Sequence, residues 1–453
     1  MTATRPLGAT SHGGAFELTS PKPRVRGTAS ARPGYLGLVG LLVTGLLISL
    51  SAAHSDLLLP ASVRLSTAVK PVPGWLAGAF GGIGLNLGLG ELIALFTLMF
   101  VSYALALRAV ERLSGRAVLM TIAALNALVL LAPPLISTDL FSYVAYGRMG
   151  ASYGANPYVL GPSAIGLDPL YPFIDAQWVH TPTAYGPLFT ALSYPLAHLG
   201  IAGNVIAYKA IAAISNLVIV AGVWNAARLR GLDPVKAVAL VGLNPVLVVY
   251  GVGGAHNDLL MLALMVTGIY VLLQQRERTS GALLVAATAV KLTAGLLLPF
   301  AIAGRRRDLR GRSGLLIGAA LASVLFGVLA FVLFGTGPLH LFGTLQKIQG
   351  GGGLHSVSGF ILTMLGLGQA GTAAGLIMDG ALVVTVVWLV RRVWLGKLDW
   401  ITGAGWATVA LLVTAGLLLP WYIAWLLPLA ALSTDRRLWL AAILLTGLAL
   451  TTL

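Results

Sequence analysis

The run GLLIGAALASVLFGVLAFVLF, residues 314–334, contains no charged residue and directly follows the basic stretch RRRDLRGRS at 305–313. A helix needs about 20 apolar residues to cross a bilayer, and similar runs recur from residue 34 onward. The 453-residue chain is 57% hydrophobic and 9% charged, with a mean hydropathy of +0.89. Soluble domains carry about 25% charged residues. The sequence therefore predicts an all-α polytopic membrane protein.

Basic residues alternate with the apolar runs, and seven clusters hold 23 of the 29 Lys and Arg. The clusters lie at 5–32, 108–116, 228–236, 276–278, 305–312, 391–397 and 436–437. Such clusters mark cytoplasmic loops, so the net charge of +15 indicates membrane orientation and not nucleic-acid binding. We expect a disordered basic cytoplasmic tail at 1–33 and a membrane domain at 34–453 in the plasma membrane.

This orientation predicts about 11–13 transmembrane or re-entrant helices, with long outer loops at about 137–204 and 335–370. Residues 281–303 lie between two basic clusters, which favours two half-helices broken near Lys291–Gly295. Residues 185–203 favour a hairpin or an oblique helix, although both segments are also compatible with tilted spans. Asn244-Pro245 predicts a break in the span at 237–253.

Asp139 is the strongest catalytic candidate. It follows Pro133-Pro134 at the outer end of a predicted span that contains no other charge. A carboxylate at the boundary of the apolar region is partly desolvated, which makes it a better general base. The alternative is that Asp139 only caps the helix that follows it.

The first outer loop is rich in aromatic and small polar residues. Candidate substrate-binding residues here are Tyr143, Arg148, Asn156 and Tyr185. Aromatic faces stack on sugar rings, while amides bind hydroxyl groups. An interfacial aromatic belt, common in membrane proteins, is the alternative interpretation.

A second group is the string Gly253-Gly254-Ala255-His256-Asn257-Asp258 between two predicted spans. His256 is a candidate for binding phosphate or positioning Asp139. Asp258 is a candidate for binding acceptor hydroxyls or orienting His256. The alternative is a helix cap formed by Asn257 or Asp258.

The second outer loop contains Lys347, four glycines at 350–353, and His355. Because the outer face has few cations, Lys347, His355 and Arg148 are candidate phosphate partners. A four-glycine run lets backbone amides approach a phosphate, but it is equally typical of a mobile loop.

Several catalytic chemistries lack their sequence signals. The chain has no cysteine, no two acidic residues two positions apart, no HExxH and no serine nucleophile elbow. The acidic pair by which many nucleotide-sugar transferases hold a metal is therefore absent. A site on the outer face without nucleotide sugars requires a lipid-borne donor.

At these residues the chain resembles the actinobacterial polyprenyl-phosphate-mannose-dependent alpha-1,6-mannopyranosyltransferases that build lipomannan backbones, which have the GT-C fold. The motifs that carry the resemblance are 137–143 with Gly147-Arg148, Asn156-Pro157-Tyr158, 183–187, Asn244-Pro245, 253–258, Lys291 with Pro299, and Pro420-Trp421-Tyr422.

The resemblance implies inverting transfer of mannose from polyprenyl phosphate mannose to a lipid-linked mannan acceptor, with Asp139 as general base and Trp421 near the substrate. No metal or other cofactor is required on this interpretation. Alternatives are a related transferase of alpha-1,2-mannose or arabinose and, from another class, a secondary transporter. A transporter favours ionisable groups at the bilayer midplane and two similar halves.

Overall fold

The computed structural model describes residues 30–66, 72–350, 364 and 371–451. All regular elements among these residues are helical, which confirms the all-α class. The longer helices are α1 (Arg32–Ser51), α3 (Leu89–Arg108), α4 (Gly115–Leu131), α5 (Asp139–Tyr153), α8 (Gly200–Leu229), α10 (Asp258–Leu273), α11 (Glu277–Val290), α13 (Leu309–Phe334), α16 (Gly371–Trp394), α17 (Trp400–Thr414) and α19 (Arg436–Ala449).

Shorter elements connect them, including one π-helix, η5 (Leu247–Gly253). The short α-helices are α2 (Ala61–Ser66), α6 (Ala176–Val179), α7 (Pro187–Leu196), α9 (Pro234–Gly242), α12 (Leu297–Gly304), α14 (Leu341–Gly350) and α18 (Leu427–Leu432). The 3-10 turns are η1 (Val110–Arg112), η2 (Pro162–Ile165), η3 (Tyr171–Phe173), η4 (Ala197–Leu199), η6 (Leu292–Leu296), η7 (Gly337–His340) and η10 (Pro420–Trp425).

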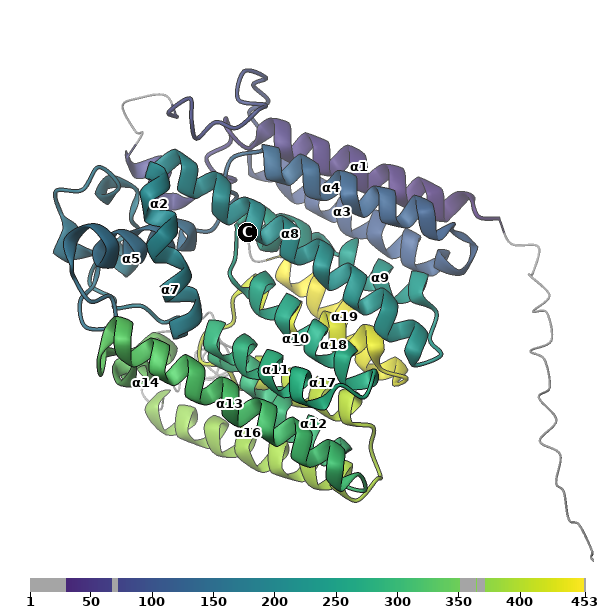
Figure 1. The fold of residues 1–453 in the computed structure, drawn as a ribbon. Helices are drawn as coiled ribbons and strands as arrows, with labels where there is room; N and C mark the ends of the chain where they lie inside the picture. The colour runs from purple at the N-terminus through teal and green to yellow at the C-terminus, as the bar shows by residue number, and fades with distance from the viewer. Residues whose placement is uncertain (1–29, 67–71, 351–363, 365–370, 452–453) are drawn as a thin grey trace, which may run out of the picture. The chain divides into compact units, whose positions relative to one another are not determined.

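Four helical units of the described chain are long and apolar enough to cross a membrane: α1, α3, the stretch Pro187–Leu229 and α13. The pair α9 and η5, bent by 60°, would make a fifth. Helices α1, α3 and α4 pack side by side, while α10 packs between α8 and α11 (Figure 1). The chain is therefore a multi-pass membrane protein.

The bend between α9 and η5 lies at the predicted Asn244-Pro245 break. Pro245 supplies no backbone N–H, and the Asn244 side chain accepts the N–H groups of Val246 and Leu247. Its amide nitrogen donates to Tyr103 and Thr446, which ties the break to α3 and α19. The break is thus stabilised both by its own Asn244 side chain and by hydrogen bonds to neighbouring helices.

The predicted break near Lys291–Gly295 is also present. Lys291 has extended backbone angles between α11 and η6, and α12 continues the chain. The N–H of Gly186 donates to the carbonyl of Val290 at this point, so the loop before α7 pairs with the break. Residues 187–203 form α7, η4 and the first turn of α8, and Pro187–Leu229 together are long and apolar enough for a span.

Candidate active site

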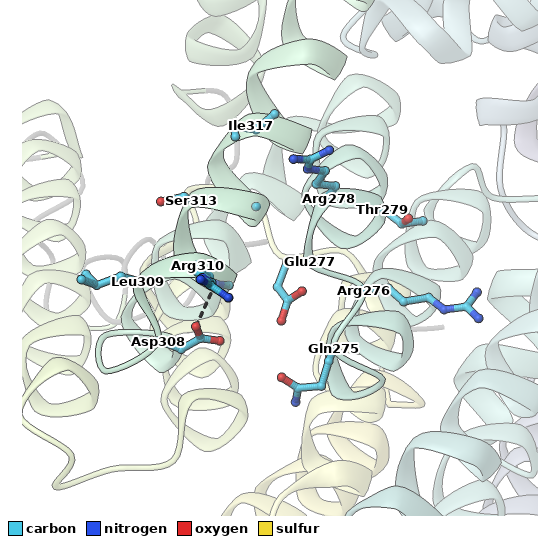
Figure 2. Close-up of a pocket in the computed structure, with 12 residues that line it drawn as sticks. Gln275, Arg276, Glu277, Arg278, Thr279, Asp308, Leu309, Arg310, Ser313 and Ile317 are labelled. Atoms are coloured by element: carbon cyan, nitrogen blue, oxygen red, sulfur yellow. Dashed lines mark hydrogen bonds between the residues drawn. The ribbon is translucent and has the colours of Figure 1, made fainter.

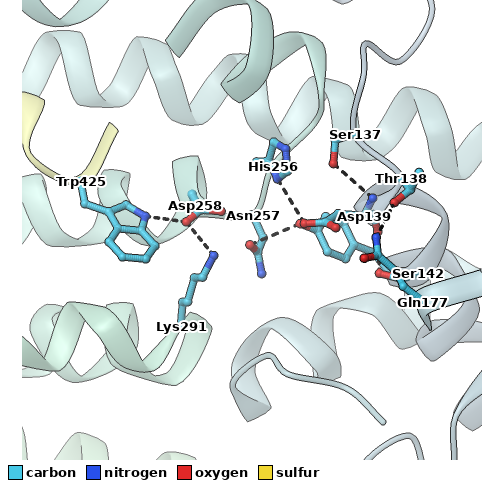
Figure 3. A network of polar contacts seen from close by, with 11 residues as sticks. Ser137, Thr138, Asp139, Ser142, Gln177, His256, Asn257, Asp258, Lys291 and Trp425 are labelled. Atoms are coloured by element: carbon cyan, nitrogen blue, oxygen red, sulfur yellow. Dashed lines mark hydrogen bonds and ion pairs between the residues drawn. The ribbon is translucent and has the colours of Figure 1, made fainter. Parts of the chain in front are cut away.

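Asp139 is the first residue of α5, but it does not cap that helix. The N-cap is Thr138, whose side chain forms no cap hydrogen bond, and the Asp139 N–H donates to the Ser137 hydroxyl. The Asp139 side chain is 10% exposed, and its Oδ2 lies 3.5 Å from Nδ1 of His256 (Figure 3). The described residues donate no hydrogen bond to this carboxylate. It is therefore available to accept a proton.

The three consecutive residues His256, Asn257 and Asp258 each contact a different part of the site. His256 faces Asp139, and the Asn257 Oδ1 accepts a 3.4 Å hydrogen bond from the hydroxyl of Tyr143. Asn257 is the N-cap residue of α10, yet its side chain forms no cap bond. These side chains thus serve contacts between helices and not the capping role considered above.

Asp258 is held by two short contacts. Its Oδ1 lies 2.7 Å from Lys291 Nζ and accepts a 2.6 Å hydrogen bond from Trp425 Nε1 (Figure 3). The Lys291 ammonium also lies 4.9 Å from the ring centre of Tyr422 and 5.3 Å from that of Trp425. Both distances are in the cation–π range. The Asp258 carboxylate and the two aromatic rings together compensate the positive charge of Lys291.

Aromatic rings cover the same region. Trp421 stacks on His256 with ring centres 3.9 Å apart and planes 23° apart. Tyr143 meets Tyr185 edge to face at 4.9 Å. Burial, and then the negative charges of Asp139 and Asp258, raise the pKa of Tyr143 well above its usual value. Its phenol therefore stays protonated and can donate to Asn257.

The site contains a concentration of buried polar atoms without hydrogen-bond partners. They are His256 Nδ1 and Nε2, Asn257 Nδ2, Asp258 Oδ2 and Trp421 Nε1. Leaving such an atom unsatisfied costs about 1–3 kcal/mol. Five of them in four neighbouring residues indicate a place where a polar ligand would supply the missing partners.

Two strained backbone segments support the site. Ile136 (φ 62°) and Ala255 (φ 55°) are non-glycine residues in the left-handed region. A direct hydrogen bond joins the two segments, from the Leu135 N–H to the Gly253 carbonyl at 2.9 Å. Strain of this kind costs about 1–3 kcal/mol per residue and persists where the surrounding structure enforces it. The segments that carry Asp139 and His256 are therefore held together by a backbone hydrogen bond.

Two other predicted residues of the first loop have partners outside this cluster. Arg148 donates from Nε to Asp168 at 2.8 Å and forms an ion pair with it, and Tyr153 donates to the same oxygen. Burial alone would raise the pKa of Asp168, but hydrogen bonds led by that from Arg148 outweigh burial and lower the pKa. The Asn156 amide donates to the Phe334 carbonyl at the end of α13. Both residues brace the loop.

The candidates of the second loop are Lys347 and His355. Lys347 is exposed on α14. His355 lies outside the described residues. Their expected phosphate contacts therefore remain predictions.

Lys291 and Trp425 were absent from the predicted site residues, although Lys291 had a sequence signal. It is a lone cation in an otherwise apolar stretch, and such groups are functional candidates by default. Trp425 carried no signal beyond its aromatic character, since nothing local relates it to Asp258 across 167 positions.

An arginine-rich cavity of about 830 Å³ lies apart from this site, between the starts of α11 and α13 (Figure 2). Its lining includes Arg276, Arg278 and Arg310. The 16 residues of α10, Asp258–Leu273, span about 24 Å. Asp258 is the first residue of this helix, whereas Gln275 of the cavity follows shortly after its last residue. The polar site and this basic cluster thus lie at opposite ends of one apolar helix.

The family model for the alpha-(1->6)-mannopyranosyltransferase N-terminal domain matches residues 35–305, which is more than half of the chain. The model for glycosyltransferase family 87 matches residues 183–453. Asp139 lies in the first match, Trp421 and Trp425 in the second, and residues 256–258 in both.

Similar curated proteins carry the same family name. Alpha-(1->6)-mannopyranosyltransferase A of Mycobacterium tuberculosis is 32% identical over 207 residues, covering 44% of this chain and 40% of that protein. Alpha-(1->6)-mannopyranosyltransferase A of Corynebacterium glutamicum is 30% identical over 185 residues, covering 40% and 37%. Alpha-(1->6)-mannopyranosyltransferase B of Corynebacterium glutamicum is 28% identical over 312 residues, covering 60% and 50%.

The chain therefore spans half or less of the length of each of these relatives. No solved structure matches significantly. The family assignment rests on the first family model, whose match includes Asp139 and the His256–Asp258 string. The chain belongs to the alpha-(1->6)-mannopyranosyltransferase family.

Proposed function

We propose that this chain transfers mannose from polyprenyl phosphate mannose to a lipid-linked mannan acceptor, forming alpha-1,6 linkages at the outer face of the plasma membrane. The observation that carries the proposal is the free carboxylate of Asp139 beside five buried polar atoms that lack partners. Family membership supplies the sugar and the linkage.

Asp139 acts as the general base. It takes the proton of the acceptor hydroxyl while that oxygen attacks the anomeric carbon, and the bond to the donor phosphate breaks with its electron pair leaving on the phosphate. The attack from the opposite face inverts the anomeric configuration. A positioned base contributes about 10²–10⁴-fold to such a step, and alignment of the two substrates contributes further.

Asp258 is the competing carboxylate, and its contacts argue against it. Its Oδ1 already interacts with Lys291 at 2.7 Å and Trp425 at 2.6 Å, so this oxygen is occupied. Asp139 has only the 3.5 Å contact with His256. The carboxylate with fewer stabilising donors is the better base, so Asp258 anchors Lys291 instead.

The departing phosphate requires a positive partner or hydrogen-bond donors. Lys291 is the cation held closest to the His256–Asp258 string, through its contact with Asp258. The Asn257 amide and the Trp421 indole each have a free N–H for phosphate or sugar oxygens. The rings of Trp421 and Tyr185 offer apolar faces for sugar rings.

The proposed outer-face location is supported by the separation of the polar site from the basic clusters along α10. The site lies at the end of α10 opposite to the arginines of 276–278 and 305–312, and such clusters mark the cytoplasmic side. A cytoplasmic N-terminus agrees with this orientation, because the chain also carries a basic cluster at 5–32. It also favours a lipid-borne sugar donor, because nucleotide sugars are confined to the cytoplasm.

The decisive experiment offers radiolabelled polyprenyl phosphate mannose and a mannan lipid acceptor to the purified protein in liposomes. We expect alpha-1,6-linked product from the wild type and almost none from Asp139→Asn. The matched control is Asp233→Asn, because Asp233 caps α9 through Val235 and Lys236 and asparagine caps equally well.

Other outcomes separate the alternatives. Product with alpha-1,2 linkages, or transfer from an arabinose donor only, would replace the proposed specificity and keep the site. Movement of the lipid without transfer would replace the enzyme with a transporter. Full transfer by Asp139→Asn would remove Asp139 as the base.

A further inference from the structure

Lys209, in the middle of α8, is a buried cation that the proposed chemistry does not use. Its side chain is 2% exposed, and its ammonium donates to the backbone carbonyls of Ala132 and, at 2.9 Å, Pro133. No carboxylate of the described chain forms an ion pair with it. Burying a charge costs free energy unless hydrogen bonds replace its hydration, so the two carbonyl acceptors must compensate the desolvation of the Lys209 ammonium.

Those two carbonyls open the segment 132–138, which leads directly to Asp139. Pro133 and Pro134 supply no N–H, so this segment cannot support itself as a helix. Its other hydrogen bonds include those from the Leu135 N–H to Gly253, from the Ile136 N–H to Leu58, and from the Gln177 side chain to Thr138. The Ser137 N–H donates to the Leu135 carbonyl within the segment, so most but not all of its contacts come from outside.

The ammonium suits this place for two reasons. It offers three donors, so one side chain can serve both carbonyls. The carbonyls follow the C-terminus of α4, where the helix dipole favours positive charge. A neutral apolar side chain in the same position would pack but would leave both carbonyls without this donor.

We propose that Lys209 is a positioning residue for Asp139, which fixes the start of the segment 132–138 so that the carboxylate meets the acceptor hydroxyl correctly. The inference rests on the proposed function, because it needs Asp139 as the base. A displacement of about 1 Å at a reacting group lowers rates by about 10²-fold.

The chain provides a matched control in Asn216. It lies seven residues further along α8, is fully buried, and donates to Asn126 of α4 at 3.0 Å. Lys209 and Asn216 thus join the same two regions by buried polar contacts. Only Lys209 contacts the segment before Asp139.

The test compares Lys209→Met with Asn216→Leu in liposomes, by kcat, KM for polyprenyl phosphate mannose, and thermal midpoint. We expect both variants to lose thermal stability. Lys209→Met should also lower kcat by about 10–100-fold with little change in KM, whereas Asn216→Leu should keep the wild-type kcat. Equal kcat values for the two variants would overturn the inference.

A second measurement repeats Lys209→Met in the Asp139→Asn background. If Lys209 acts through Asp139, the residual transfer of Asp139→Asn should fall little further. An equal fractional loss in both backgrounds would show a general structural role. If Lys209→Met gives no folded protein, Lys209→Gln replaces it; its single amide should give an intermediate kcat, and a wild-type kcat would refute the proposal.

Failure of the proposed function gives a different experimental result from failure of the role inferred for Lys209. Full transfer by Asp139→Asn would refute the base assignment itself. Loss of transfer in Asp139→Asn, together with unchanged kcat in Lys209→Met, would refute only the role of Lys209.

Discussion

The start of α5 and the start of α10 each carry a buried aspartate as the first helical residue, yet the two carboxylates have different surroundings. Asp139 is 10% exposed and has one 3.5 Å contact, with His256. Asp258 is 2% exposed and interacts with Lys291 and Trp425 at 2.7 Å and 2.6 Å. Two buried aspartates at equivalent helix positions thus differ in their number of short contacts, and the proposed function assigns the base to the one with fewer.

The largest expected effect is on catalysis at Asp139. Asp139→Asn keeps the shape of the side chain and removes its basicity, so transfer should fall by about 10²–10⁴-fold with little change in thermal midpoint. Single-turnover transfer from radiolabelled donor measures the loss. If Asp258→Asn reduced transfer more while remaining equally stable, the two roles would have to be exchanged.

The next effect is on stability at Asp258. Asp258→Ala leaves the Lys291 ammonium buried beside the rings without its carboxylate, which should cost about 3–5 kcal/mol. Denaturation of the purified protein in detergent measures this loss. Unchanged stability would mean that Lys291 is compensated mainly by Tyr422 and Trp425.

A smaller effect is expected when both partners are removed. In the variant Asp258→Ala with Lys291→Met no buried charge is left unpaired, so stability should recover most of what Asp258→Ala loses. Transfer should stay low, because the proposed phosphate partner is gone. Recovery of transfer together with stability would remove Lys291 from the donor site.

The smallest effect concerns a further aspartate, Asp168. It lies in the first loop and accepts a hydrogen bond from Arg148. Its pKa is lowered from 3.8, so its ionised form stabilises the fold above this pH, and the stabilisation is lost as the pH falls through the lowered folded-state pKa. Asp168→Asn should lower stability by about 1–3 kcal/mol near neutral pH, with the difference shrinking below about pH 4. Thermal midpoints across pH measure it. A difference that persists in acid would contradict the ionic contribution.

Much of the fold was predictable because membrane burial leaves a local signal. The apolar runs that recur from residue 34 onward include α1 and α3, the run 314–334 lies within α13, and the breaks at Asn244 and Lys291 are present as predicted. In the site, Asp139, Tyr143, Tyr185, Trp421 and residues 256–258 come together. Arg148 and Asn156 contact Asp168 and Phe334, which lie 20 and 178 positions away, and their predicted substrate contacts stay predictions.

The all-α membrane class, Asp139 and the His256–Asp258 string can be identified in the amino-acid sequence, because apolar length, proline breaks and isolated polar groups are local properties. The difference in contacts between the two carboxylates depends on the packing of the helices. Trp425 reaches Asp258 across 167 positions, and Lys209 reaches Ala132 across 77. Such contacts depend on how helices pack, and no spacing along the chain encodes them.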